Sequence, residues 1–80
     1  MIKYSPSQKY TDEGRLLAAI IKAGFFPRLE YEGKAGWYVF IYRRYGAEIL
    51  ANGNKRTRRG AIIAAIKEAN YKLKAEAQDE

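Results

Sequence analysis

The chain has 80 residues, a formal net charge of +6, and neither Cys nor His. This length corresponds to one small domain, and the missing residue types exclude disulfides, thiolate zinc sites and catalysis by a His general base. No apolar run approaches the ~20 residues of a membrane span, and no apolar segment follows the first residues as in a signal peptide, so we expect a soluble cytoplasmic protein without metal or cofactor.

The first quarter of the chain predicts an arm and a helix. Residues 1–10 contain the turn formers Ser5-Pro6-Ser7-Gln8 and predict a loose N-terminal arm. Thr11 is a favourable N-cap, and the two acidic residues after it suit the positive end of a helix dipole. Apolar residues then recur at helical spacing: Leu16, Leu17, Ile20, Ile21 and Ala23. Because Gly24 stands where a C′ residue ends a helix, we expect a helix over residues 12–23.

Three strands and two hairpin turns are predicted next. Leu29 and Tyr31 alternate with charged residues, which is a strand pattern, and residues 33–36 (Gly-Lys-Ala-Gly) predict a turn. Residues 37–42 (Trp-Tyr-Val-Phe-Ile-Tyr) are β formers at every position and predict the strongest strand. A second turn is expected at residues 43–46, a short third strand at 47–51, and a closing turn at 52–54 (Asn-Gly-Asn).

The C-terminal part predicts a second helix. Thr57 can cap it, and its apolar stripe consists of Ala61, Ile62, Ala65, Ile66, Ala69 and Leu73. This pattern fits a helix over residues 58–74, followed by an acidic tail at 76–80 that frays. The order α-β-β-β-α predicts an α+β fold with a single domain over residues 11–75. Its three-stranded antiparallel sheet carries both helices on one face, because so small a sheet cannot support two cores.

The strand at residues 37–42 predicts an aromatic surface. Because side chains alternate along a strand, one face carries Trp37, Val39 and Ile41, and the other carries Tyr38, Phe40 and Tyr42. We expect the branched set to pack against the helices and the second set to form a row on the open face. Three interpretations of that row are open: a homodimer or other protein interface, a contact with Tyr4 and Tyr10 of the arm, and a platform on which single-stranded bases stack.

A basic cluster lies between the second hairpin turn and the last helix. Six of the fifteen Lys and Arg residues fall within residues 43–59, where Glu48 is the only acid. They are Arg43, Arg44, Lys55, Arg56, Arg58 and Arg59. Cations in a turn that opens a helix add to the positive end of the helix dipole, which suits phosphate or an acidic protein surface. The simpler interpretation is a solvated face that maintains solubility.

Within this cluster, Thr57-Arg58-Arg59-Gly60-Ala61, with Ala65 one turn later, resembles the start of the last helix in the double-stranded RNA-binding domain. That family shares the α-β-β-β-α order and has a glycine-containing turn before the motif, here at Gly53. The resemblance implies that Arg58 and Arg59 bind phosphates across the major groove, while the first helix and first hairpin loop touch minor grooves. The family's third basic position falls on Ile62, and the loop at 33–36 lacks the family's Pro and His.

Two functions follow as hypotheses. The first is a small basic nucleic-acid-binding protein, not an enzyme, that contacts phosphates more than bases. The second is a phage-type inhibitor, such as an anti-CRISPR or other anti-defence protein, that blocks the nucleic-acid site of a protein complex. The stretch from residue 36 to 65 is similar to small phage-type β-β-β-α modules.

Glu30 and Glu32 share a strand face and could form a carboxylate pair. Arg28 and Lys34 beside them favour a charge-balanced strand edge over a catalytic carboxylate pair.

Overall fold

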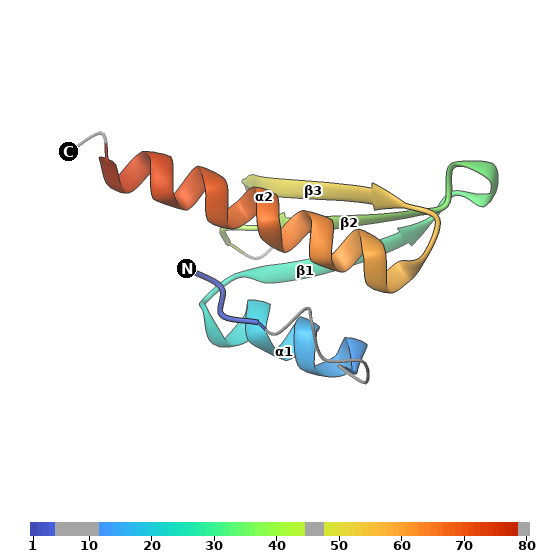
Figure 1. Ribbon diagram of the computed structural model, residues 1–80, viewed down its shortest axis with the longest axis horizontal. Helices are drawn as coiled ribbons and strands as arrows, with labels where there is room; N and C mark the ends of the chain where they lie inside the picture. Colours follow the sequence, from blue (N-terminus) through green and yellow to red (C-terminus); the bar gives the residue numbers. More distant parts are fainter. Residues whose placement is uncertain (5–11, 45–47, 79–80) are drawn as a thin grey trace.

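The computed structural model describes residues 1–4, 12–44 and 48–78. The elements in chain order are helix α1 (Glu13–Lys22), strand β1 (Phe26–Tyr31), the 3-10 turn η1 (Gly33–Ala35), strand β2 (Trp37–Tyr42), strand β3 (Ile49–Lys55) and helix α2 (Arg58–Gln78). Strand β2 lies in the middle of the sheet and pairs antiparallel with both neighbours (Figure 1). The predicted α+β fold, with its element order, is confirmed.

Helix α1 begins one residue later than the sequence predicts. Its N-cap is Asp12, whose carboxylate accepts a hydrogen bond from the Gly14 N–H at 2.9 Å, and the predicted cap Thr11 lies outside the described residues. The helix ends at Lys22, one residue before the predicted end, and Gly24, whose φ is 94°, is the C′ residue as predicted. The Gly24 N–H donates to the Ile21 carbonyl and the Phe25 N–H to the Ile20 carbonyl, which is the Schellman pattern.

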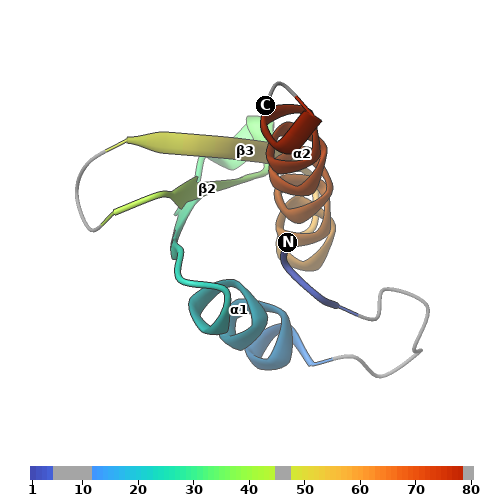
Figure 2. The same cartoon turned by 90° about the vertical axis from the view of Figure 1, so that its left-hand side faces the viewer.

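One hydrophobic core lies between the sheet and both helices. Its largest fully buried side chains are Leu16, Ile20, Val39, Ile41, Ile62 and Ile66. Helix α2 packs on β3 and β2, while α1 packs beside β1 on the same face (Figure 2). Val39 and Ile41 are completely buried and Trp37 packs against the core, so the predicted inward face of β2 is confirmed.

Strand β3 is longer than predicted and includes the Asn-Gly-Asn segment. Asn52, Gly53 and Asn54 pair with Phe40, Val39 and Tyr38 of β2, so the expected closing turn is wrong. The Asn54 side-chain amide donates to the carbonyls of Ala35 (2.9 Å) and Trp37 (3.0 Å), which anchors the strand end to the neighbouring hairpin. Glycine fits here because β3 approaches α2 closely: a Cβ on Gly53 would lie 2.4 Å from the Ala61 carbonyl oxygen.

The first residues dock onto α2 instead of forming a loose arm. Ile2 is 2% exposed and belongs to the core. The Ile2 N–H donates to Asn70 Oδ1 at 2.8 Å, and Asn70 Nδ2 donates to the Ile2 carbonyl at 2.9 Å. A side-chain amide on α2 thereby holds the backbone of Ile2 as a neighbouring strand would. The predicted loose arm is wrong for residues 1–4, and the rest of it lies outside the described residues.

Replacing Asn70 with Ala is expected to lower the free energy of unfolding by about 2 kcal/mol. Both backbone hydrogen bonds of Ile2 are lost, and its partly buried polar groups are left without a partner. Urea denaturation measures the change, with Lys67→Ala, one turn earlier on α2 at an exposed position, as the control. Equal midpoints for the two variants would contradict this role for Asn70.

Candidate nucleic-acid interface

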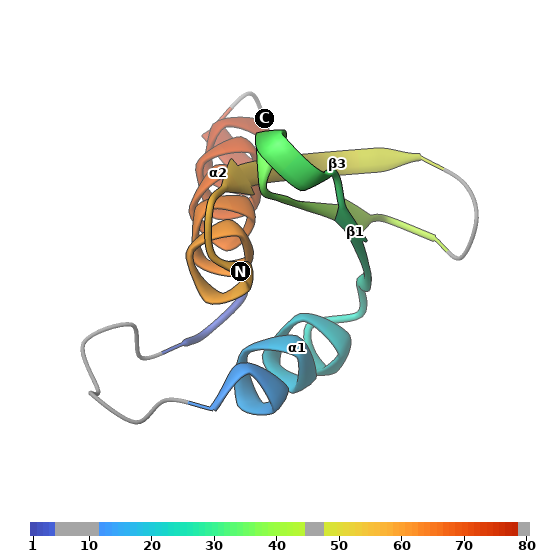
Figure 3. The ribbon, with the colours of Figure 1, turned by 90° about the vertical axis from the view of Figure 1, so that its right-hand side faces the viewer.

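The six predicted basic residues lie at two opposite ends of the sheet. Arg43 and Arg44 follow the end of β2, where the Arg43 N–H donates to the Glu48 carbonyl at 2.8 Å. The other four lie where β3 passes into α2. In Figure 3 the molecule is seen from this second end, so that η1 and the first turns of α1 and α2 face the viewer. The cluster therefore does not form one surface, as the position of Arg43 and Arg44 on the second hairpin turn, at the opposite end of the third strand, predicts.

Arg43 has structural partners. Its guanidinium pairs with Glu76 in the last turns of α2 and lies 3.5 Å from the Glu48 carboxylate. Its side chain is only 29% exposed. Helix α2 continues past the predicted end at residue 74 to Gln78, and so Glu76 sits in a helix where a frayed tail was expected. Arg43 therefore joins the hairpin end to α2, while Arg44 is exposed.

Arg58 also has structural partners. It pairs with Glu13 in the first turn of α1, and its guanidinium carbon lies 5.3 Å from the centre of the Trp37 ring. That ring in turn lies 5.1 Å from the Tyr31 ring. Ion pairing and a cation–π contact thus connect the starts of both helices with the start of β2. Half of the Arg58 side chain is exposed, and its charge remains at this end of the molecule.

The Arg58→Met variant is expected to lose about 1 kcal/mol of its free energy of unfolding. The contact with Trp37 supplies most of this loss, because the ion pair with Glu13 is partly exposed and screened by solvent. Unfolding in urea can be followed by the fluorescence of Trp37, the single Trp of the chain. Arg56→Met, which removes an exposed cation two residues earlier, should change stability by no more than a few tenths of a kcal/mol.

A close backbone contact brings a further cation to this end. Gly36 has a φ of 84°, and a Cβ there would lie 2.5 Å from the Lys55 carbonyl oxygen and 2.9 Å from the Arg56 Cα. The η1 turn therefore abuts the connection between β3 and α2, and it carries the exposed Lys34. We call Lys34, Lys55, Arg56, Arg58 and Arg59 the basic end. Sequence reasoning missed Lys34 as a site residue. Only the folded hairpin, in which Trp37 pairs with Lys55, brings the turn at residues 33–36 next to Lys55.

The cations of the basic end differ in their environment. Lys55 and Arg56 are exposed, and neither forms a salt bridge with any carboxylate of the described residues. Arg59 is half-buried in the first turn of α2, which contains no acidic residue. Thr57 caps this helix as predicted, accepting from the Gly60 N–H at 3.0 Å. Ile62, at the family's third basic position, is fully buried in the core.

The open face of the sheet carries the predicted aromatic row. Tyr38, Phe40 and Tyr42 project away from the helices and are half-buried. The Tyr38 and Phe40 rings are parallel within 9°, with their centres 6.1 Å apart. Tyr4 packs against the core, so the alternative that it covers this row is wrong, and Tyr10 lies outside the described residues.

The neighbours of the row differ along its length. Opposite Tyr42 lie the apolar residues Phe26 and Ile49, which are 39% and 49% exposed. Polar residues flank the rest of the row: Arg28 and Asn52 beside Phe40, and Glu30 and Asn54 beside Tyr38. The side chains at the end of the row near Tyr38 are therefore more polar than those at the end near Tyr42.

Glu30 is charge-balanced, as expected for a strand edge. It pairs with Arg28, and the Tyr42 side chain together with Glu30 raises the pKa of Arg28 above its ordinary value. A shallow depression of about 270 Å³ lies beside Tyr38 and Phe40 and is also lined by Glu30, Glu32 and Ala35. Since Arg28 neutralises one of its two carboxylates, the depression does not present a free acid pair.

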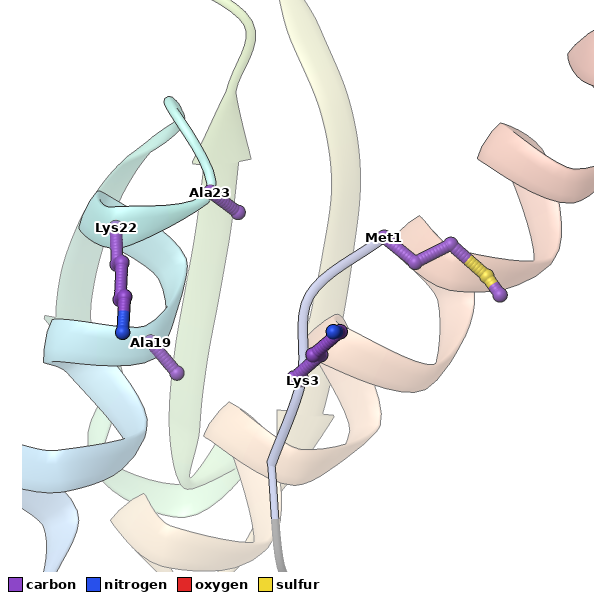
Figure 4. Close-up of a pocket in the computed structure, with 5 residues that line it drawn as sticks. All are labelled: Met1, Lys3, Ala19, Lys22 and Ala23. Atoms are coloured by element: carbon purple, nitrogen blue, oxygen red, sulfur yellow. The ribbon is translucent and has the colours of Figure 1, made fainter.

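A second depression, of about 360 Å³, lies between the N-terminal segment and the end of α1 (Figure 4). Its lining residues are Met1, Lys3, Ala19, Lys22 and Ala23. None of them has a carboxylate or hydroxyl, so the depression offers no acid–base pair. Elsewhere in the described ranges, no three acidic residues gather as metal ligands would, and no described helix is long and apolar enough to cross a membrane.

Comparisons with protein-family models, curated proteins and solved structures found no match to this chain. The resemblance to the double-stranded RNA-binding domain therefore stays a prediction. Any function has to be inferred from the charges and contacts of the basic end and from the open face.

Proposed function

We propose that this protein binds nucleic acid by contacts between the basic end and backbone phosphates. The observation that carries the proposal is the backbone contact of Gly36 with Lys55 and Arg56. It places cations from η1 and from the β3–α2 connection next to the start of a helix whose first turn has no acid. Lysine and arginine residues that lie close together in this way neutralise phosphates and release counterions.

The exposed cations Lys34, Lys55 and Arg56 are the proposed phosphate ligands. Arg58 has a smaller role in the proposal than the family resemblance implies, because Glu13 and Trp37 already hold its guanidinium. Such contacts position a nucleic acid without distinguishing its sequence. We therefore propose binding that depends strongly on salt and weakly on sequence.

Fluorescence anisotropy with labelled oligonucleotides at low salt tests the proposal. Polyglutamate of equal charge is the control, because it separates phosphate binding from attraction to any acidic chain. We expect oligonucleotides of different sequence to bind equally well and at least about tenfold more tightly than polyglutamate. No change in anisotropy with single-stranded or duplex oligonucleotides would show that the proposal is wrong.

A further inference from the structure

We propose that the open face of the sheet stacks unpaired bases on Tyr38 and Phe40, so that the ligand of this protein is single-stranded nucleic acid. This inference rests on the proposed function and narrows it to one class of nucleic acid. Duplex bases are already stacked on one another and cannot lie on a protein ring, whereas every unpaired base has a free face for an aromatic side chain.

The two rings have a suitable arrangement. Tyr38 and Phe40 lie on the middle strand, with parallel planes and centres 6.1 Å apart. No described element covers this face, since α1, α2 and residues 1–4 all pack on the other side. Two parallel rings at this spacing offer stacking surfaces to two successive bases of an extended strand.

The rings and the basic end are adjacent. Tyr38 pairs with Asn54, and the exposed Lys55 and Arg56 follow Asn54 at this end of the sheet. Because side chains alternate along a strand, Lys55 lies on the face of its partner Trp37, opposite to the rings. A strand whose phosphates contact Arg56 and Lys55 at this end of the sheet would have its nearest bases beside Tyr38. A cationic track next to aromatic rings is the combination by which single strands are bound without sequence preference.

Charge on the two outer strands indicates the path of the ligand backbone. On the β1 side, Arg28 balances the charge of Glu30 beside the rings, and the exposed Glu32, two residues later, leaves an unbalanced acid at the end near Tyr38. On the β3 side the exposed Asn52 and Asn54 are neutral, and Lys55 is cationic. The backbone should run along β3 with its bases directed towards β2.

The size of the face argues against a second copy of the chain as the occupant. Three strands of about six residues form a face of roughly 20 Å by 14 Å, or about 280 Å². Side chains make the accessible surface larger than this flat area. Even twice the flat area is below the ~800 Å² that each partner of a stable complex buries. A ligand that attaches by a few stacked groups needs far less area.

Substitution of both rings by Leu tests the inference. The Tyr38→Leu, Phe40→Leu variant keeps an apolar surface but cannot stack, so affinity for twelve-nucleotide oligothymidylate should fall by about tenfold or more. An abasic strand of the same length should bind wild type and variant equally, because it carries the phosphates without bases. Phe40→Tyr should retain wild-type affinity, and Tyr71→Leu, which removes a 76% exposed ring on α2, should have no effect.

Several results would overturn the inference. They are equal affinity of the wild type for oligothymidylate and for the abasic strand, tighter binding of a twelve-base-pair duplex, and an unchanged affinity of the double Leu variant. A dimer in sedimentation that the Leu variant abolishes would assign the face to protein contact instead. If the abasic strand binds as tightly as oligothymidylate, base stacking is refuted and the proposed function stands. If no oligonucleotide binds, both are refuted.

Discussion

The Gly53→Ala variant is expected to lose about 3 kcal/mol of its free energy of unfolding. A Cβ at this position would lie 2.4 Å from the Ala61 carbonyl oxygen and 2.6 Å from the Ala65 amide nitrogen. Both atoms belong to the backbone of α2, so no side-chain rotation can relieve the overlap. The strand and helix must move apart, which loosens the contacts of Ile62 and Ile66 in the core.

Gly14→Ala is the matched control for this prediction. A Cβ on Gly14 would have the Asp12 carboxylate oxygens as its nearest neighbours, at 3.5 Å, which is ordinary contact. Because Gly14 lies within α1, its replacement by Ala should increase stability by about 0.5 kcal/mol. Urea denaturation followed by Trp37 fluorescence measures both variants. A Gly53→Ala midpoint as high as that of the wild type would refute the close packing of β3 on α2.

The Lys55→Ala, Arg56→Ala variant is expected to lose between about 25-fold and 60-fold in nucleic-acid affinity at 0.1 M salt. Each phosphate contact contributes about 0.7 to 0.9 to the slope of log affinity against log salt, so the loss of two contacts lowers its magnitude by about 1.4 to 1.8. The loss should be the same for oligonucleotides of different sequence, because these residues contact phosphates only. Anisotropy titrations at several salt concentrations measure both quantities.

Arg44→Ala is the control for charge alone. Arg44 is exposed but follows the far end of β2, about 20 Å along the strand from the basic end. At 0.1 M salt the Debye length is about 10 Å, so its charge contributes little at that distance. If Arg44→Ala weakens binding as much as the double variant does, net charge determines binding and the basic end is not a site.

Local sequence patterns were sufficient for most of the fold. The β formers of β2 predicted its bounds, Gly24 predicted the end of α1, and Thr57 predicted the cap of α2. Each of these features depends on residues close together in the chain. The alternation along β2 also predicted which side chains enter the core, because a strand admits only two faces.

The extent of β3 was not predictable in the same way. Asn and Gly favour turns locally, and their strand conformation here depends on distant contacts. Gly53 lets α2 approach, and the Asn54 amide binds carbonyl groups of the preceding hairpin. The docking of Ile2 on Asn70, 68 residues away, likewise leaves no periodic pattern in the sequence.

The basic cluster shows why a count of charges does not define a site. Arg58 and Arg43 pair with Glu13 and Glu76, at separations of 45 and 33 residues, so neither is a free phosphate ligand. Lys34 joins the basic end only because the hairpin folds back onto β3. The cluster predicted an anionic partner, but the fold determines which cations are available to bind it.

The salt dependence of single-strand binding tests the central claim most directly. Affinity for labelled oligothymidylate would be measured between about 20 mM and 200 mM salt and plotted on logarithmic axes. With Lys34, Lys55 and Arg56 as phosphate ligands, we expect a slope of about −2 or steeper, at about −0.7 for each contact on a single strand. A slope near zero, or no binding at the lowest salt, would contradict nucleic-acid binding by the basic end.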